Sequence, residues 1–555
     1  MTQNLRNIAS KTIFEPLHAQ FVHLTQKGIF LHLQRDSKKE TPQAALVQVS
    51  AAYPWPGTAE NGSWLLNGLF QYPGGIESAI AAFWGPTDAP GRHCFSWLPD
   101  LRALGGDQAR QTARFLIASW MDTHGAKPQK PVWDIECTAK RLSSLILLYD
   151  FHGASAHSVY QALTAEIIGR HATYLVKIVP TLRPSRAALE AAAALILAGL
   201  ATDTYTPWVE VGEEGLCKNL SAQILADGGH ISRSPQELAE TLRLCIDLKR
   251  MYMESGKPAP EQMIQAIDRM ADALQVFRFT DRKLTLFHGS QEQSDAILDL
   301  LIFQAGASRN KPLRSLPDSG FERMSLGRTV ILFDVGKPPA YPFDKKASCA
   351  PLAFEMAFGK ERIIVNCGTH PFSKEWMQAL RATPAHSSVT LANRNAFEVK
   401  KDGFLGRTAK RVTSRREELG QAVLVEGEHD GYVPVNNYKH KRRLYLTDRG
   451  QDFRGEDTLY TESEATPETP IPFAVRFHLH PRVKVSLVRD GSEALLRLPS
   501  GIGWRFQLSG GRLSLEDSVY MGEGYSPVKT RQIVVSGEIH DTAHQIRWAL
   551  QREGA

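Results

Sequence analysis

The side chains best suited to chemistry lie in one short stretch, residues 227–235 (DGGHISRSP). Its two adjacent glycines permit backbone angles that other residues avoid, and Pro235 suits the first position of a helix. The stretch separates two segments with helical periodicity, so we expect a loop that carries His230 and Arg233 to a surface. Catalytic groups are often held on such loops, although a plain helix connector with an incidental histidine is the more common outcome.

The elements that must position this loop are expected to be helices, from about residue 105 to about residue 305. Apolar residues recur there at helical spacing, and glycine, proline and polar clusters separate the segments. The expected helices are 107–121, 135–149, 158–178, 186–200, 216–225, 235–254, 261–275 and 292–304. A series of helices without intervening strands predicts a curved helical array or toroid. The first hundred residues are expected to form loops and short strands instead.

After about residue 315 the pattern changes to short β-type runs about ten residues apart, which is typical of an antiparallel sandwich. Residues 453–472, rich in Glu, Thr and Pro, are expected to form a long surface loop. The predicted fold class is α+β and multidomain, with an N-terminal (α/α) toroid followed by a C-terminal antiparallel β-sandwich. The predicted boundaries are 1–105 for an irregular segment leading into the toroid, 106–310 for the toroid and 311–555 for the β-sandwich domain.

Bulk composition limits the class of protein. A chain of 555 residues exceeds the size of a single core, and 43% hydrophobic with 22% charged residues is ordinary for a soluble protein. The net charge of +6 mildly favours an acidic partner and fits a polyanionic sugar as well as RNA. The cysteines form no Cys-x-x-Cys pair, which argues against a zinc ribbon or a thioredoxin-like site.

Targeting signals are not evident in the sequence. The first ten residues lack the apolar core of a signal peptide. The apolar stretch 187–201 is short for a membrane span and contains Glu190, so a buried helix explains it better. The sequence by itself therefore predicts a cytoplasmic protein without a transmembrane segment, and it does not indicate an oligomeric state.

Several further motifs follow one another in order along the chain. They are 97–107 in the helical half and 352–355, 365–368, 385–389, 429–432, 454–457 and 477–481 in the β half. Together with the DGGH loop, this ordered set resembles the heparinase II/III family of polysaccharide lyases, in particular its heparinase II/III-like branch in α-proteobacteria. The resemblance extends over most of the chain. It implies the same toroid and sandwich, an active site between them, and a place in the cell envelope or periplasm.

Lyases of this kind cleave uronate-containing chains by β-elimination. A base removes the proton α to the carboxylate, an acid protonates the leaving oxygen, and an Arg, Asn, His or cation neutralises the carboxylate. The resemblance and the residue types together select His230, Tyr432, His429 and His386 as catalytic candidates. The candidates for binding the substrate are Arg233, Arg186, Arg454, Glu456 and Asp457.

The chain departs from the family's pattern at several of its functional positions. Glu237 stands where the family usually has a tyrosine, and Lys346-Ala-Ser348 replaces a His-x-His pattern. Asn366 replaces an aspartate, and only His386 keeps the type of a metal ligand. Neutral Ser and Asn with one His make a poor zinc site, so we expect no cofactor, although a zinc or calcium ion remains open.

Simpler structural explanations compete for the other motifs. Residues 429–432 are equally well explained by a β-turn, and residues 454–457 by a turn with a local salt bridge. His478 and His480, two residues apart on an expected strand, can pair on a metal but are more often structural.

These features leave three hypotheses for the function. The first is a carbon–oxygen lyase that cleaves an acidic polysaccharide. The second is a non-catalytic glycan-binding or cell-envelope assembly protein on the same scaffold, motivated by the missing tyrosine and metal ligands. The third is nucleic-acid binding through the basic run 439–443. A solvated strand edge explains this run more plainly, so no nucleic-acid partner is expected.

Overall fold

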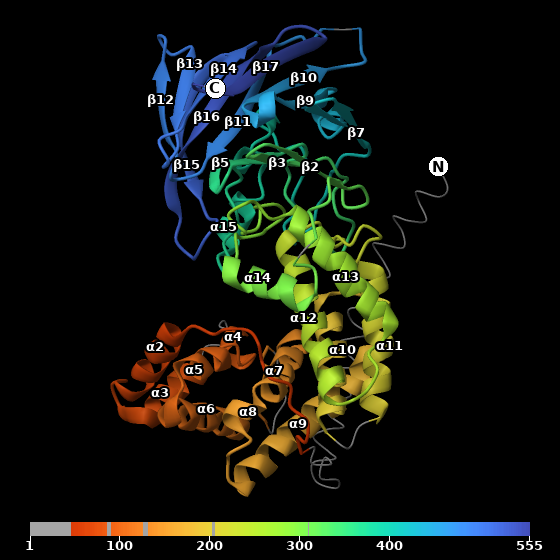
Figure 1. Ribbon diagram of the computed structural model, residues 1–555, viewed down its shortest axis with the longest axis vertical. Coiled ribbons are helices and arrows are strands. Elements are labelled where there is room, and N and C mark those ends of the chain that lie inside the picture. The colour runs from red at the N-terminus through yellow and green to blue at the C-terminus, as the bar shows by residue number, and fades with distance from the viewer. Residues whose placement is uncertain are drawn as a thin grey trace. The chain divides into compact units, whose positions relative to one another are not determined.

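The computed structural model describes residues 46–85, 90–125, 131–202, 206–308, 310–464 and 466–554. The first ten residues, where no signal peptide is expected, and Pro86 of the expected N-terminal loops lie outside these ranges. The chain divides into two compact units. Met1–Gln223 and Arg243–Gln265 form the helical unit, and Ile224–Leu242 and Ala266–Ala555 form the β unit. Figure 1 labels the elements of both.

The helical unit confirms the predicted series of helices. Its helices are α2 (Ala59–Phe70), α3 (Gly75–Trp84), α4 (Pro90–His93), α5 (Leu98–Leu104), α6 (Gly106–Trp120), α7 (Ile135–Leu147), α8 (Tyr149–His152), α9 (Ser158–Ile178), α10 (Arg186–Ala201) and α11 (Thr206–Gln223). Helices α12 (Pro235–Glu254) and α13 (Glu261–Val276) contribute residues to both units. The predicted first and last residues of α9 and α12 match the structure. Both helices start at clear sequence signals, a polar residue in α9 and Pro235 in α12.

Helix α10 forms the centre of the helical unit and explains the apolar stretch near residue 190. Every residue from Ala188 to Ala201 is buried, and the helix packs against α7 and α11. The Ser185 hydroxyl caps its first turn by accepting a hydrogen bond from the Ala188 N–H at 3.2 Å. Among the described residues, no helix combines the length and the apolar character needed to cross a bilayer.

The expectation of loops and short strands in the first hundred residues was wrong. Helices α2, α3, α4 and α5 occupy much of residues 59–104. Gly74 and Gly75, with φ of 94° and 83°, form the turn between α2 and α3. Glycines and prolines that mark helix ends were therefore mistaken for an irregular region.

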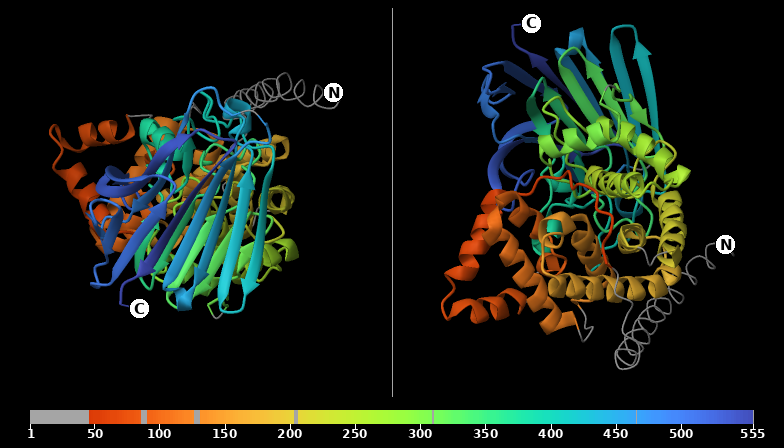
Figure 2. Two further views of the ribbon diagram at one scale, coloured as in Figure 1. Left: turned by 90° about the horizontal axis from the view of Figure 1, so that it is seen from above. Right: turned by 60° about the horizontal axis from the view of Figure 1, so that its bottom comes forward.

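The β unit consists of two antiparallel sheets, as the strand spacing predicted. One sheet has the order β1-β2-β3-β4-β5-β11-β16-β15, with β6 paired to β11, and the other has the order β12-β13-β14-β17-β10-β9-β8-β7. Figure 2, left, shows strands of this unit lying side by side. The first sheet is built from β1 (Ser315–Leu316), β2 (Phe321–Leu326), β3 (Thr329–Asp334), β4 (Phe354–Phe358), β5 (Glu361–Val365), β6 (Val389–Leu391), β11 (Ile471–Leu479), β15 (Arg512–Tyr520) and β16 (Val528–Ile539). The second is built from β7 (Val412–Leu419), β8 (Ala422–His429), β9 (Lys439–Thr447), β10 (Asp452–Tyr460), β12 (Lys484–Val488), β13 (Glu493–Arg497), β14 (Gly503–Ser509) and β17 (Ala543–Arg552).

One continuous hydrophobic core joins the two sheets. Phe354 on β4 stacks on Trp548 on β17 with ring centroids 5.6 Å apart, and Phe453 on β10 meets the same indole edge-on at 5.3 Å. Aromatic rings bury large apolar areas, so this cluster contributes strongly to holding the sheets together.

Strand β10 corrects the first part of the surface loop predicted over residues 453–472, whereas residues 461–464 and 466–470 lie outside helices and strands, as expected. It pairs with β9 on one side and with β17 on the other, deep within the second sheet. Its inward-facing residues are Phe453, Gly455, Asp457 and Leu459. The sequence pattern concealed the strand, because glycine and aspartate interrupt the apolar alternation. The basic run 439–443 likewise lies within β9, with alternate side chains buried.

The β unit also begins earlier than the expected boundary near residue 310. Residues 224–242 and everything from Ala266 onwards belong to it. The reason lies in long-range hydrogen bonds to the strands. The Leu286 N–H donates to Glu355 Oε1 at 3.1 Å, and Arg362 Nη2 donates to the Leu284 carbonyl at 2.9 Å.

Candidate functional site

The loop at residues 227–235 forms as predicted and is fixed against the start of β2. Asp227 accepts hydrogen bonds from the Ser319 N–H and hydroxyl at 2.7 and 2.8 Å, and from the Gly229 N–H at 2.9 Å. Gly228 has φ +83°, and a β-carbon there would lie 2.1 Å from the Arg269 carbonyl oxygen. Only glycine fits this position, so the loop is a rigid part of the β unit.

Arg233 was expected to contact a substrate, but it forms part of a buried ion pair. Its guanidinium binds both oxygens of Asp334 and donates to the Ser319 carbonyl at 2.6 Å, and its side chain is only 6% exposed. His288 Nε2 donates to Asp334 at 3.0 Å, since its Nδ1 accepts the Ser348 N–H at 3.2 Å. Burial alone would raise the pKa of Asp334, but the Arg233 charge and these hydrogen bonds lower it to about 2.

A second ion pair joins two of the positions at which the chain departs from the pattern expected of the family. Glu237, in place of the tyrosine, accepts a hydrogen bond from Lys346 Nζ, in place of a histidine. The Glu237 side chain is 12% exposed and the Lys346 side chain is 48% exposed. Two residues that are 109 positions apart in sequence therefore pair in space.

The other positions of the family's metal-ligand pattern are bonded within the β unit. His386 is buried and donates from Nδ1 to the Ala382 carbonyl at 3.0 Å, and burial lowers its pKa to about 4. Asn366 accepts the Ser387 N–H at 3.1 Å. Within the described part of the chain, no three His, Cys, Asp or Glu side chains are placed to hold a metal ion. Neutral Ser348 and Asn366 with His386 make a poor donor set for zinc by their chemistry. The absence of a cofactor stays a prediction.

His230 lies within the β unit and is buried. Its Nδ1 accepts the Ser232 N–H at 3.1 Å and lies 2.7 Å from the Ser232 hydroxyl. The ring is 4% exposed and meets Phe343 edge-on, with centroids 6.3 Å apart. Its catalytic role stays a prediction.

Tyr432 and His429, expected as acid and base, lie in the core of the β unit. The Tyr432 side chain is fully buried and its hydroxyl donates to the Val389 carbonyl at 2.6 Å. His429 accepts the Gly431 N–H at Nδ1, so its Nε2 donates to His440 at 3.2 Å. Both side chains therefore form hydrogen bonds within the β unit, and their catalytic roles stay predictions. Burial raises the pKa of Tyr432 and lowers that of His429.

The expected sugar-contacting residues 454–457 lie on strand β10 and not in a loop. Asp457 points inward, is fully buried, and binds Arg442, His440 and the Trp548 indole N–H. Arg454 and Glu456 point outward on the same strand. Arg454 pairs with Asp452, and Glu456 with Arg547 at 2.8 Å.

Arg186 belongs to the helical unit, where it is the first residue of α10. Its Nη2 lies 2.6 Å from Oε1 of Glu190, one helical turn away. This pairing explains how Glu190 is accommodated in a buried helix.

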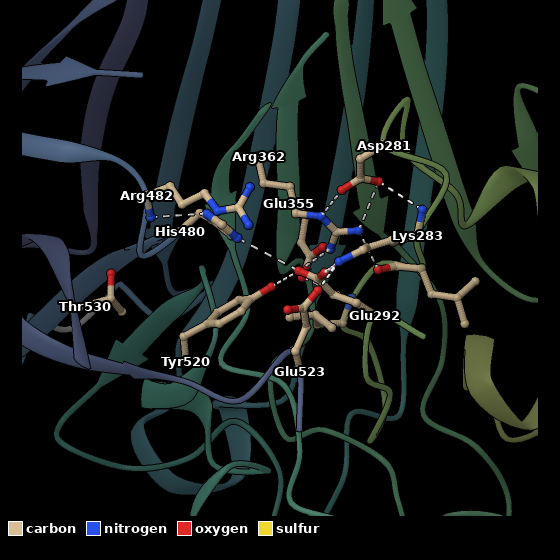
Figure 3. Close-up of polar contacts among 12 residues, drawn as sticks. Asp281, Lys283, Glu292, Glu355, Arg362, His480, Arg482, Tyr520, Glu523 and Thr530 are labelled. Carbon is tan, nitrogen blue, oxygen red and sulfur yellow. Dashed lines mark hydrogen bonds and ion pairs between the residues drawn. The ribbon is translucent and has the colours of Figure 1, made fainter. Parts of the chain in front are cut away.

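A pocket of about 450 Å³ in the β unit contains ionisable side chains of which the sequence analysis singled out only His480 (Figure 3). Its inner wall consists of Tyr520 at the end of β15, Arg362 on β5, and Glu292, which precedes helix α14 (Asp295–Gln304). The Tyr520 hydroxyl donates to Glu292, Lys283 Nζ lies 3.0 Å from the same carboxylate, and Arg362 Nη1 lies 3.6 Å from it. His480 follows β11, and its ring lies 5.1 Å from that of Tyr520.

The electrostatics of this pocket keep Glu292 ionised. Burial would raise its pKa, but Arg362, the Tyr520 hydroxyl and Lys283 lower the pKa to about 2. Burial lowers the pKa of His480 to about 4, so its imidazole is neutral near pH 7. Among the residues of this pocket, the sequence offered a functional signal only for His480. The other residues come together from segments up to 228 residues apart, so their spacing in the sequence does not reveal the pocket.

The geometry can now be compared with known proteins. Residues 308–549 match the family model described as "Heparinase II/III-like, C-terminal". FtsZ-localized protein C of Caulobacter vibrioides (strain NA1000 / CB15N) is 32% identical over 521 residues, which are 90% of this chain and 89% of that protein. The chain belongs to the heparinase II/III-like family. The family assignment from the ordered motifs is confirmed.

Solved structures of this heparinase II/III-like family share its fold. Heparinase III has a TM-score of 0.70 at 13% identity, with 94% of this chain and 89% of that chain covered. The heparinase III BT4657 gene product has a TM-score of 0.68 at 16% identity, covering 94% and 88%. Heparan sulfate lyase HepC from Pedobacter heparinus has a TM-score of 0.61 at 16% identity, covering 95% and 88%. The protein is thus an (α/α) toroid with an antiparallel β-sandwich, on a polysaccharide lyase-like scaffold.

Proposed function

We propose that this protein is a non-catalytic member of the heparinase II/III-like family that localises with FtsZ. The observation that carries the proposal is the Glu237–Lys346 ion pair, because it occupies two positions where the family's pattern has ionisable functional residues. A fold does not fix a function, and a lyase scaffold can serve as a binding platform after its chemistry is lost.

Three side chains that were predicted to catalyse or to bind substrate support the same proposal. Tyr432 and His429 are at most 1% exposed, and Arg233 is neutralised by Asp334. A base or acid must come within hydrogen-bond reach of the proton it transfers, which buried and bonded groups cannot do without rearrangement. The relative with 32% identity is named for its localisation with FtsZ, whereas the lyases share 13–16% identity with this chain.

The test is to follow a fluorescent fusion of the protein in its own cells before and after depletion of FtsZ. We expect the fusion to overlap with FtsZ and to disperse when FtsZ is removed. The variant Glu237→Gln should localise like the parent, because the proposal requires no chemistry at this position. If the distribution of the fusion did not change after FtsZ depletion, the proposal would be wrong.

The second candidate is a lyase that acts on an acidic polysaccharide. The observation that favours it is the pocket of Figure 3, where Tyr520, His480 and Arg362 bring together the residue types that β-elimination uses. In that reaction the proton α to the carboxylate leaves with a base. The carbon–oxygen bond to the leaving sugar breaks, and a double bond forms in the uronate ring.

The lyase is tested by incubating the purified full chain with uronate-containing polysaccharides and recording the ultraviolet absorbance of the unsaturated product. A signal that disappears in Tyr520→Phe would establish the lyase and refute the non-catalytic proposal. A signal that persists in Tyr520→Phe would point to a contaminating enzyme. We expect no signal from the parent.

A further inference from the structure

The helical unit contains two thiols whose sulfur atoms lie in direct contact. Cys94 follows α4, Cys137 lies in the first turn of α7, and their Sγ atoms are 2.9 Å apart. Neither cysteine is in a disulfide. A disulfide bond is about 2.05 Å long, so a small movement of the two side chains brings the sulfurs to bonding distance. Cys137 is 6% exposed, and Cys94 is partly exposed, so a small molecule can reach the pair from the Cys94 side.

Arg141, one turn after Cys137 on α7, places a positive charge beside this pair. Its Nη1 lies 3.7 Å from the Cys137 sulfur and donates to the His93 and Val132 carbonyls at 2.7 and 3.2 Å. His93 directly precedes Cys94. The same guanidinium therefore holds the backbone next to one thiol and contacts the sulfur of the other.

The charge of Arg141 has no carboxylate partner among the described residues. The side chain is fully buried, and its guanidinium carbon lies 4.0 Å from the centre of the Trp120 ring. Its Nε donates to Nε2 of His171 at 2.8 Å, and this imidazole is neutral because its Nδ1 donates to the Ile167 carbonyl. Of the groups that Arg141 contacts, only the Cys137 sulfur can therefore become an anion. A buried cation favours an anion beside it.

The two thiols differ in how readily they lose a proton. A hydrogen bond from Cys94 and the Arg141 charge lower the pKa of Cys137, although burial opposes them. The same hydrogen bond, together with burial, raises the pKa of Cys94. Cys94 therefore keeps its proton and donates it in a hydrogen bond to the Cys137 thiolate. The thiolate is the form of cysteine that reacts with oxidants.

We propose that Cys94 and Cys137 are a redox-sensitive modification site that closes to a reversible disulfide, with a peroxide as the oxidant. The Cys137 thiolate attacks one oxygen of hydrogen peroxide, the O–O bond breaks, and Cys137 sulfenic acid and hydroxide form. The Cys94 sulfur then attacks the sulfenic sulfur, the S–O bond breaks, and the disulfide and water form. The two sulfurs together lose two electrons. The hydroxide takes up the proton that Cys137 released on ionising, so the peroxide is reduced to two water molecules.

The disulfide joins α7 to the connection between α4 and α5 across 43 residues of sequence. Arg141 already binds both segments, so closure requires little rearrangement of the backbone. In this reaction Arg141 is a positioning residue, because it acts by stabilising the Cys137 thiolate. Both cysteines belong to the helical unit, and the inference does not depend on localisation with FtsZ.

The test treats the reduced full chain with hydrogen peroxide, blocks the remaining thiols with N-ethylmaleimide and maps the unreduced peptides by mass spectrometry. We expect a peptide that joins Cys94 to Cys137, lighter by two hydrogen atoms than the reduced peptides together, and dithiothreitol should cleave it. Cys217 is the matched control, since it is a partly exposed thiol of the same unit whose pKa is raised by burial. It should react at least roughly tenfold more slowly, because one pKa unit changes the thiolate fraction tenfold.

Two variants separate the roles within the site. Cys94→Ser keeps a hydroxyl donor beside Cys137 but cannot form the disulfide, so oxidation should stop at the sulfenic acid, which dimedone traps. In this background, Arg141→Gln should raise the pH at which Cys137 is alkylated at half its maximal rate. If Arg141→Gln does not fold, the pH profile of Cys94→Ser decides: Cys137 should reach half its maximal rate at a lower pH than Cys217.

Three results would overturn the inference. The first is the absence of the Cys94–Cys137 peptide after peroxide treatment. The second is a Cys217 that reacts as fast as Cys137. The third is a pH profile for Cys137 that lies at or above that of Cys217.

Discussion

Lys346 Nζ and the Glu237 carboxylate form an ion pair across 109 residues of sequence. Helix α12, which carries Glu237 in its first turn, is thereby joined to the segment that precedes β4. A carboxylate near the N-terminus of a helix is also stabilised by the helix dipole. The pair thus has a structural purpose that requires no substrate.

The strength of this pair can be measured by a double-mutant cycle. We expect Glu237→Gln and Lys346→Gln each to lower the free energy of unfolding by less than about 1 kcal/mol, because the lysine is half exposed. The double variant should lose less than the sum of the single losses. Urea unfolding monitored by circular dichroism gives all four values. Strict additivity would show that the two residues are not coupled.

Breaking the buried ion pair of Arg233 and Asp334 should lower the free energy of unfolding far more than breaking the Glu237–Lys346 pair. Asp334→Asn leaves the Arg233 charge buried without a counter-ion, so we expect a loss of roughly 3–5 kcal/mol in the free energy of unfolding. Arg454→Ala, at an exposed ion pair on β10, is the control and should change stability by less than about 1 kcal/mol. Similar small effects for both variants would contradict the buried geometry.

Asp334 should also contribute to acid unfolding. Its folded-state pKa of about 2 lies below the usual 3.8, so the native state binds this proton less readily than the unfolded state. The contribution of about 2 kcal/mol is therefore present above pH 3.8 and is lost as the pH falls through about 2. Acid titration of native-state fluorescence, compared between the parent and Asp334→Asn, should show this loss in the parent alone.

Glu355 should make the stability depend on pH in the opposite direction to Asp334. It is fully buried on β4, its Oε2 has no hydrogen-bond partner among the described residues, and burial raises its pKa to about 7. A raised carboxyl pKa means that stability falls as the pH rises from 4.5 to about 7, by up to roughly 3 kcal/mol. In Glu355→Gln this fall should disappear, as measured by urea unfolding across that pH range. If the free energy of unfolding changed with pH in the same way in the parent and the variant, this prediction would be wrong.

Tyr432→Phe distinguishes a structural role from a catalytic one. The change removes the hydroxyl that donates to the Val389 carbonyl, so we expect a loss of about 1–2 kcal/mol in stability. Localisation with FtsZ should not change. A variant of unchanged stability that no longer localises with FtsZ would restore Tyr432 to the functional site.

Local sequence patterns determined most of the secondary structure and the division into helical and β parts. Helices α9 and α12 and many strands were predictable because periodicity, capping residues and proline act within a few residues of each other. The DGGH loop was predictable for the same reason, since glycine conformations are local. The ordered motifs were enough to recognise the family.

Only the tertiary structure decided which polar side chains face inward and which partners they meet. Asp457 was expected to contact a sugar but lies in the core, because β10 is a central strand whose aspartate meets Arg442. Arg233 meets Asp334 across 101 residues, and Tyr520 meets Glu292 across 228. The free energy of such contacts depends on burial and on long-range partners, and neither is encoded in the spacing of neighbouring residues.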